Sequence, residues 1–122
     1  MLSVSPGTHI YLATEPVDLR RGHDGLTALV RQRFGMDPLE GHLFVFVGRR
    51  VDRVKILFWD RGGFVVYYKR LAQGRFRMPK VHAGADRVVL DGTELAMLLG
   101  GFDLAGARRV AAWQPRGRRH VA

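Results

Sequence analysis

Three consecutive segments with β-strand character, between residues 41 and 71, constrain the fold of this chain more than any other feature. They read GHLFVFVG (residues 41–48), VKILFWD (54–60) and GFVVYYKRL (63–71), and they are rich in β-branched and aromatic residues. The connections, centred on RRVD and RGG, are short enough for antiparallel hairpins. The sequence therefore predicts an antiparallel β-meander.

Three shorter segments extend this predicted sheet. HIYLAT (residues 9–14) alternates between apolar and polar residues, and DRVVL (86–90) is rich in β-branched residues, so each predicts a strand. GRFRMP (74–79) predicts a short edge strand that ends at its proline.

Helical patterns occur on both sides of the meander. Between residues 22 and 34 apolar residues recur at helical spacing, Gly35 stands where a helix commonly ends, and Pro38 prevents continuation. Near the C-terminus, Asp91 and Glu94 have the spacing of a capping box, which marks the start of a second helix. An apolar stripe at helical spacing follows this box: Leu95, Leu98, Leu99 and Phe102.

These elements predict an α+β domain, in which an antiparallel β-meander carries two short helices packed on one face. Because side chains alternate along a strand, parity sorts the meander into two faces. The more aliphatic face, which includes Val54 and Ile56, is expected to be the core that the helices cover. The other face mixes aromatic side chains with Lys55 and Arg70 and is expected to be partly open.

The length of 122 residues is that of a single domain. We expect residues 1–107 to form it and residues 108–122 to be a basic, mobile tail. The chain contains no cysteine, which removes disulfides, thiol catalysis and thiolate metal sites. No apolar run approaches about 18 residues and the first residues lack the pattern of a signal peptide, so a soluble cytoplasmic protein without a membrane partner is expected.

Positive charge is concentrated in the middle of the chain. The whole sequence carries 20 Lys and Arg against 11 Asp and Glu. Residues 49–80 hold ten basic and two acidic residues, a net charge of +8, whereas residues 1–48 have a net charge of −1. Clustered Arg and Lys attract the phosphates of a polyanion whatever its sequence, so nucleic acid is the expected partner.

The residues expected to contact phosphate lie in or beside the predicted hairpins: Arg49, Arg50, Arg53, Lys55, Lys69, Arg70, Arg75 and Arg77. Further candidates lie in the DLRRG loop and in the tail: Arg20, Arg21, Arg108, Arg109, Arg116, Arg118 and Arg119.

Catalytic signals are weaker. Asp18, Asp24, Asp52 and Asp60 are carboxylates that a two-metal nuclease would need to cluster, although aspartates more often cap turns and helices. The five histidines have no ligand spacing, and no phosphate-binding glycine loop or nucleophile motif is present. No catalytic residue, metal or cofactor is therefore predicted, and a small metal-dependent nuclease stays as the least favoured alternative.

Three longer stretches resemble a known family: PVDLRRGHDGLTALV, the run from residue 41 to 76, and ELAMLLGGFD. They are similar to the accessory protein of IS-sixty-six-type bacterial insertion sequences, which is the product of the element's second open reading frame and is labelled TnpB in that family. An RNA-guided nuclease with the same label is several times longer and is a different protein. Val51 departs from the family pattern, because a turn glycine is common there, and its β-branched side chain resists a positive φ.

The resemblance implies an accessory role in bacterial DNA transposition beside a separate, larger transposase. The favoured hypothesis is a non-catalytic factor that binds DNA at the element ends, assists the transposase, or does both. A second hypothesis is an interaction module that docks on the transposase without contacting DNA itself. The sequence does not indicate an oligomeric state, a preferred DNA sequence or a choice between DNA and RNA.

Overall fold

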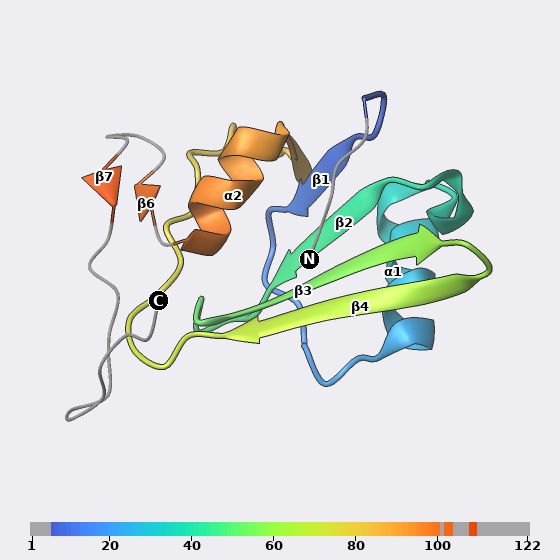
Figure 1. The fold of residues 1–122 in the computed structure, drawn as a ribbon, viewed down its shortest axis with the longest axis horizontal. Coiled ribbons are helices and arrows are strands. Elements are labelled where there is room, and N and C mark those ends of the chain that lie inside the picture. The colour runs from blue at the N-terminus through green and yellow to red at the C-terminus, as the bar shows by residue number, and fades with distance from the viewer. Residues whose placement is uncertain (1–5, 101, 104–107, 110–122) are drawn as a thin grey trace, which may run out of the picture.

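The computed structural model describes residues 6–100, 102–103 and 108–109. A five-stranded sheet with two helices forms the main body, and a separate pair of two-residue strands follows (Figure 1). In chain order the elements are β1 (Ile10–Ala13), α1 (His23–Phe34), the 3-10 helix η1 (Pro38–Glu40), β2 (Leu43–Val47), β3 (Arg53–Asp60), β4 (Gly63–Arg70), β5 (Arg87–Leu90), α2 (Gly92–Gly100), β6 (Phe102–Asp103) and β7 (Arg108–Arg109).

The strand order in the sheet is β4-β3-β2-β1-β5. β2, β3 and β4 are antiparallel neighbours, so the predicted meander is confirmed. β1 pairs with β2 in parallel, which the sequence patterns did not predict, and β5 pairs antiparallel with β1 at the far edge. The fold is α+β, as predicted, with one parallel pair inside a mostly antiparallel sheet.

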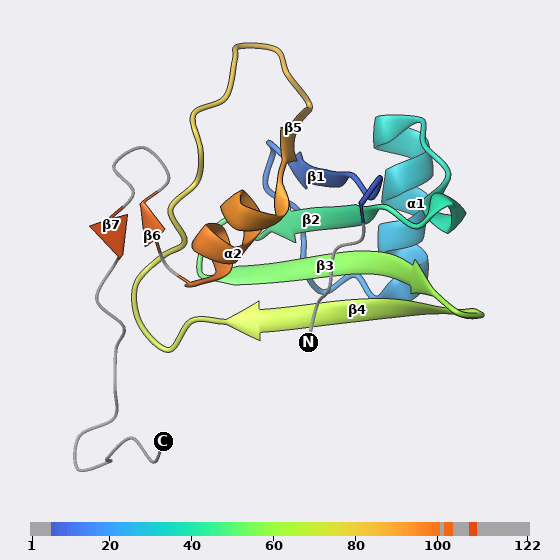
Figure 2. The same ribbon diagram turned by 45° about the horizontal axis from the view of Figure 1, so that its top comes forward.

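The two helices cover opposite faces of the sheet, so the prediction that both pack on one face is wrong (Figure 2). A parallel pair needs a crossover connection, and α1 lies in the connection between β1 and β2. All five residues of β2 are buried, because α1 covers one of its faces and α2 the other.

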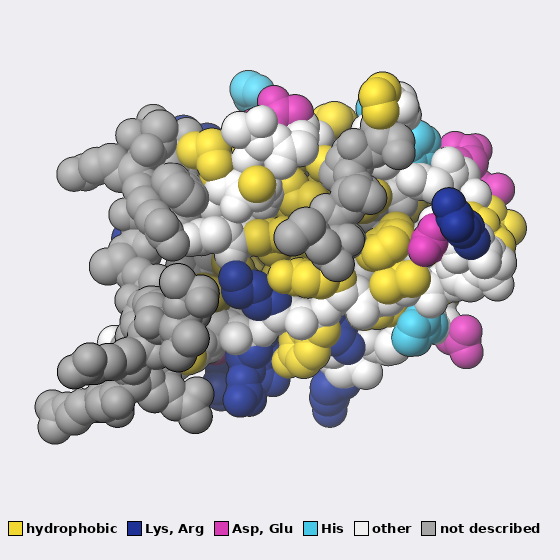
Figure 3. Space-filling view, in the orientation of Figure 1, with side chains coloured by type: hydrophobic (Ala, Val, Ile, Leu, Met, Phe, Trp, Pro, Cys, Tyr) yellow, Lys and Arg dark blue, Asp and Glu magenta, His cyan; other side chains and the backbone are white. Residues whose placement is uncertain are grey.

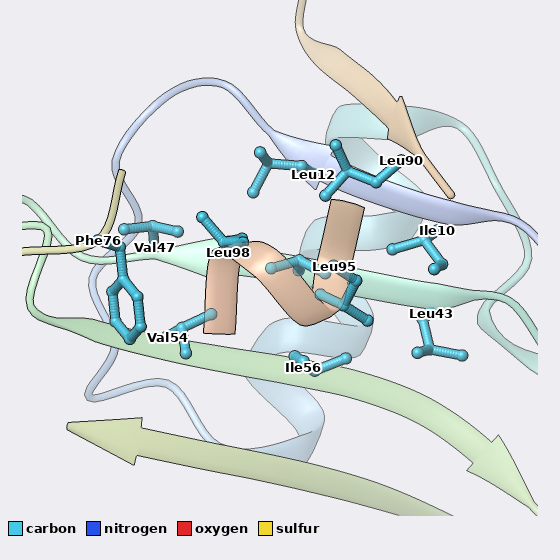
Figure 4. Close-up of a cluster of buried hydrophobic side chains, with 11 residues drawn as sticks. Ile10, Leu12, Leu43, Val47, Val54, Ile56, Phe76, Leu90, Leu95 and Leu98 are labelled. Carbon is cyan, nitrogen blue, oxygen red and sulfur yellow. The ribbon is translucent and has the colours of Figure 1, made fainter. Parts of the chain in front are cut away.

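Each helix closes its own apolar core. The core under α2 includes Leu95 and Leu98, which point toward the sheet in Figure 4. Its other buried members are Ile10, Leu12, Leu43, Val45, Val47, Val54, Ile56, Phe76 and Leu90. The core under α1 consists of Ala13, Val17, Leu26, Leu29, Val30, Phe34, Phe44, Phe46 and Leu57.

Strand pairing confirms the predicted sorting of side chains by parity. Leu57 pairs with Phe44 on one side and with Val66 on the other, so these three share the α1 face. That face is buried at Phe44 and Leu57 and opens toward both edges of the sheet, where Tyr68 of β4 is 49% and Val89 of β5 is 57% exposed. The prediction of a partly open face is therefore correct for β4 and wrong for the strands that α1 covers.

Both predicted helix signals have the expected geometry. Gly35 ends α1 with φ 61°, a left-handed conformation that glycine adopts without strain, and its N–H donates to the Val30 carbonyl. At α2 the backbone N–H of Glu94 donates to Asp91 Oδ1 (2.7 Å), and the backbone N–H of Asp91 donates to Glu94 Oε1 (3.0 Å). This is the reciprocal capping box that the spacing predicted.

Residues 74–79 do not form the predicted edge strand. Phe76 is buried in the core under α2, and its N–H donates to the Val51 carbonyl (2.7 Å). The segment is therefore held across the β2–β3 hairpin instead of along β4. Within the described part of the chain, no helix is long and apolar enough to cross a membrane.

Candidate nucleic-acid interface

One end of the sheet brings distant parts of the chain together. β1, β2 and β4 finish there, and β3 and β5 begin there, because β1 is parallel to β2, Ala13 pairs with Arg87 and Arg53 pairs with Arg70. Residues 71–77 stay beside the β2–β3 hairpin, where Leu71 N–H donates to the Asp52 carbonyl (2.8 Å). We call this end the basic end, because four segments of the chain bring eight arginines to it, besides Arg87 of β5, which donates to the Phe34 carbonyl (3.0 Å): Arg20, Arg21, Arg49, Arg50, Arg53, Arg70, Arg75 and Arg77.

Most of these arginines are exposed to solvent. Arg53 is the exception, with a half-buried side chain. In Figure 3 the Lys and Arg side chains gather along the lower side of the molecule, toward the end at which β4 finishes. Most acidic side chains visible on that face lie at the right or at the top. On this face charge is therefore separated, as it is along the sequence.

The two lysines among the predicted phosphate contacts have partners within the protein. Lys55 Nζ donates to the Arg21 carbonyl (2.8 Å) and lies 5.2 Å from the centre of the Tyr68 ring. Lys69 Nζ donates to the Leu99 carbonyl (2.7 Å), near the C-terminus of α2. A cation at that position satisfies a free carbonyl and interacts favourably with the helix dipole. Lys69 is thus turned toward α2 and not toward the arginines.

The loop before α1 is ordered by an ion pair. Arg20 donates through Nε to Asp18 Oδ1 (3.0 Å) and through Nη2 to Asp18 Oδ2 (2.7 Å), and its backbone N–H also donates to Oδ1 (3.0 Å). These hydrogen bonds, the side-chain one first, lower the pKa of Asp18 from 3.8 to about 2. The Asp18 carboxylate thus ties the side chain and the backbone of Arg20 to this loop.

The four aspartates considered for a nuclease are dispersed. Asp18 and Asp52 line one groove, whereas Asp60 ends β3 at the opposite end of the sheet and Asp24 lies in the first turn of α1. Among the described residues, no group of three His, Cys, Asp or Glu side chains could hold a metal ion.

The β2–β3 hairpin presents Arg49 and Arg50 at its tip. The Val51 N–H donates to the Gly48 carbonyl (2.9 Å), and Val51 has φ 61°. This is the positive φ that its β-branched side chain resists. The β3–β4 hairpin at the other end of the sheet turns through Arg61 (φ 42°) and Gly62 (φ 89°), as a two-residue primed turn requires.

Backbone strain at Val51 leads to a testable prediction. We expect the Val51→Gly variant to be more stable than Val51→Ala by about 1 kcal/mol, because both remove similar packing and only glycine relieves the left-handed conformation. Chemical denaturation of both variants measures this difference. At Val89, which is exposed in β5, the same two substitutions should rank in the opposite order. An alanine variant more stable than glycine at position 51 would contradict the prediction.

Two of the five arginines expected in the tail lie among the described residues. Arg108 and Arg109 form β7, which pairs with β6. Arg116, Arg118 and Arg119, and with them most of the predicted tail, lie outside the described residues.

A known family model matches most of the chain. The model is described as IS66 Orf2-like protein, and it matches residues 8–109, which include the whole basic end. The chain belongs to the IS66 Orf2-like family. This membership confirms the resemblance seen in the sequence, and it supports a role accessory to the transposition of an insertion sequence, in association with the IS66 transposition machinery.

Two proteins from Sinorhizobium fredii are similar to this chain over nearly their whole length. The first, Uncharacterized protein y4jC, is 37% identical over 115 residues, which cover 94% of this chain and 97% of the relative. The second, Uncharacterized protein y4hO, is 32% identical over 115 residues, covering 94% and 96%. No solved structure matches the chain significantly.

The sequence patterns missed the groove at the basic end, which residues 16–20 line together with residues 48–50, Asp52 and Arg53. They did not place the first strand within the sheet, so they gave no reason to bring these two loops together. They meet because β1 and β2 are parallel, so that the connections after both strands leave the sheet at the same end.

Proposed function

We propose that this protein binds the DNA of its insertion sequence through the basic end, as a non-catalytic accessory factor that acts with the transposase in the bacterial cytoplasm. The observation that carries this proposal is the convergence of eight arginines from four segments on one end of the sheet. The family match supports the role in transposition, and the cluster of positive charge supports nucleic acid as the partner.

The dimensions of the basic end suit a nucleic-acid backbone. β1 to β4 are neighbours in the sheet, and three strand spacings of about 4.8 Å give a width of about 14 Å. Duplex DNA carries one phosphate charge per about 1.7 Å of its axis, so a surface of this width reaches several phosphates. Arginines on different strands are then able to contact different phosphates.

Arginine suits this task better than the lysines available. A guanidinium presents several donors in a planar fork that matches phosphate oxygens, and it is always charged. Lys55 and Lys69 already donate to carbonyls of the protein. We therefore assign the phosphate contacts to the arginines, with Lys55 supporting the loop that carries Arg20 and Arg21.

An electrophoretic shift assay with duplexes of the element ends, run with and without Mg²⁺, tests the proposal. We expect a shifted complex and intact DNA under both conditions, because the basic end supplies phosphate contacts. A duplex of unrelated sequence serves as the control for sequence preference.

Two other outcomes would contradict the proposal, and each supports a different alternative. The absence of a complex with any duplex would favour a module that docks on the transposase. Mg²⁺-dependent nicking would favour a nuclease. The four aspartates, which are dispersed in the structure, would then have to support catalysis without forming one cluster.

A further inference from the structure

A groove of about 510 Å³ opens at the basic end between the segment before α1 and the β2–β3 hairpin. One wall consists of residues 16–20 and the other of residues 48–50 with Asp52 and Arg53. Four arginines and two aspartates line it, so its charged side chains sum to +2. The groove is large enough for a phosphate group with part of its sugar.

The two walls are tied to each other by the backbone. Val17 N–H donates to the Val47 carbonyl (3.0 Å), which fixes the first wall to the end of β2. Leu19 lies so close to Gly48 that a Cβ built on Gly48 would come within 3.3 Å of Leu19 Cδ1. Because both walls are held before any ligand arrives, the groove is preorganised, which reduces the entropic cost of binding.

Arg53 supplies an unsatisfied donor at this groove. Its Nε atom is shielded from solvent and has no hydrogen-bond partner among the described residues. The nearest carboxylate oxygen, Asp52 Oδ1, lies 3.9 Å from Nε, too far for a hydrogen bond. The side chain as a whole is 42% exposed, so an anion in the groove would be contacted by the exposed remainder of the guanidinium and not by the shielded Nε.

Arg20 is held in position at the opposite wall. The Asp18 carboxylate accepts from its Nε and Nη2, and the side chain of Arg20 is otherwise 91% exposed. The ion pair leaves the remaining guanidinium N–H groups free to donate to a ligand. Asp18 therefore acts on the geometry of Arg20, whereas Asp52 makes no such bond to Arg53.

We propose that this groove seats one backbone phosphate of the DNA, with Arg20 and Arg53 as donors from opposite walls and Asp18 as a positioning residue for Arg20. Arg49 and Arg50, on the hairpin wall, contact the same phosphate or its neighbour. The inference rests on the proposed DNA-binding function and assigns it a specific contact. The proposal predicts different effects on DNA affinity for substitution of Asp18 and Asp52, whereas their charge alone predicts the same effect for both.

Asp18→Asn and Asp52→Asn form a matched pair that tests the positioning role. Both substitutions remove one negative charge from the groove, so charge alone predicts tighter DNA binding for both. We expect Asp52→Asn to tighten binding and Asp18→Asn to weaken it by about 2- to 5-fold, a range typical of an exposed ion pair. Fluorescence anisotropy of a labelled duplex at fixed salt measures both affinities with the full chain.

A double-mutant cycle separates positioning from a general loss of structure. In the Arg20→Gln background the Asp18 carboxylate has nothing to orient, so Asp18→Asn should no longer weaken binding and should instead tighten it. Thermal melts of all variants identify any that do not fold. Tighter binding by Asp18→Asn in the parent protein, or equal losses with and without Arg20, would overturn the positioning role.

Inorganic phosphate is a second probe that does not depend on DNA. We expect its titration to shift the amide resonances of Gly48 and of residue 53 in the parent and to shift the resonances at the same two positions less in Arg53→Gln. Phosphate shifts without any DNA binding would leave the groove intact and contradict the proposed function. DNA binding without phosphate shifts at these residues would overturn the groove assignment and leave the proposed function standing.

Discussion

Changing Arg50, Arg70 and Arg75 together to Gln is expected to weaken binding to duplex DNA on the order of 100-fold at 0.1 M salt. The three arginines are exposed and come from three different parts of the basic end. Removal of each phosphate-binding charge should lower the slope of log affinity against log salt by about 0.9, so the slope should flatten by roughly two to three. Fluorescence anisotropy titrations of a labelled duplex between 50 and 200 mM salt measure this slope for the parent and the variant.

Arg61→Gln is the matched control for this experiment. Arg61 is exposed at the tip of the β3–β4 hairpin, at the opposite end of the same strands from Arg70. Its replacement should leave the slope unchanged, while Arg70→Gln alone should lower it by about 0.9. Equal salt dependence in the folded triple variant and the parent would remove the basic end from the DNA-binding surface. Truncation after Trp113 would then test the arginines of the predicted tail.

Leu98→Ala is expected to lower the free energy of unfolding by about 2–5 kcal/mol. Leu98 is 1% exposed, and it packs from α2 onto one face of the sheet in the core drawn in Figure 4. The substitution removes buried methyl groups and leaves a cavity that the surrounding strands fill only partly. Chemical denaturation measures the change.

The same substitution at Leu39 provides the control. Leu39 lies in η1 and is 46% exposed, so Leu39→Ala should change the free energy of unfolding by less than about 0.5 kcal/mol. An unchanged Leu98→Ala variant would show that α2 contributes little to the stability of the sheet. DNA binding by the folded fraction of Leu98→Ala should match the parent, because α2 contributes no arginine to the basic end.

Local patterns predicted the elements of this fold well. The strand segments, the turn at Arg61 and Gly62, and the capping box of Asp91 and Glu94 depend on neighbours within a few residues. Such features are set by backbone sterics and short-range hydrogen bonds, which the sequence contains directly. The alternation along β3 and β4 also sorted their side chains correctly, because the turn between them has two residues.

The placement of the helices was the principal error, and one signal in the sequence bears on it. The run LFVFV, from Leu43 to Val47, is apolar at every position instead of alternating. Such a run is typical of a strand buried on both faces, and it is a reason to expect a helix on each side. Parity alone does not reveal this arrangement, because it sorts side chains to faces without showing which faces are covered.

Local patterns were enough to locate the five strands of the main sheet, the helices α1 and α2, the family resemblance and the concentration of positive charge between residues 49 and 80. The parallel pairing of β1 with β2, which brings Arg20 to the same end of the sheet as Arg53, became visible only in the folded chain. The same is true of Lys55 and Lys69, which donate to carbonyls of the protein, whereas seven of the eight arginines of the basic end are exposed. Strand order and direction depend on contacts between residues far apart in the sequence, and a local pattern does not record which strands pair.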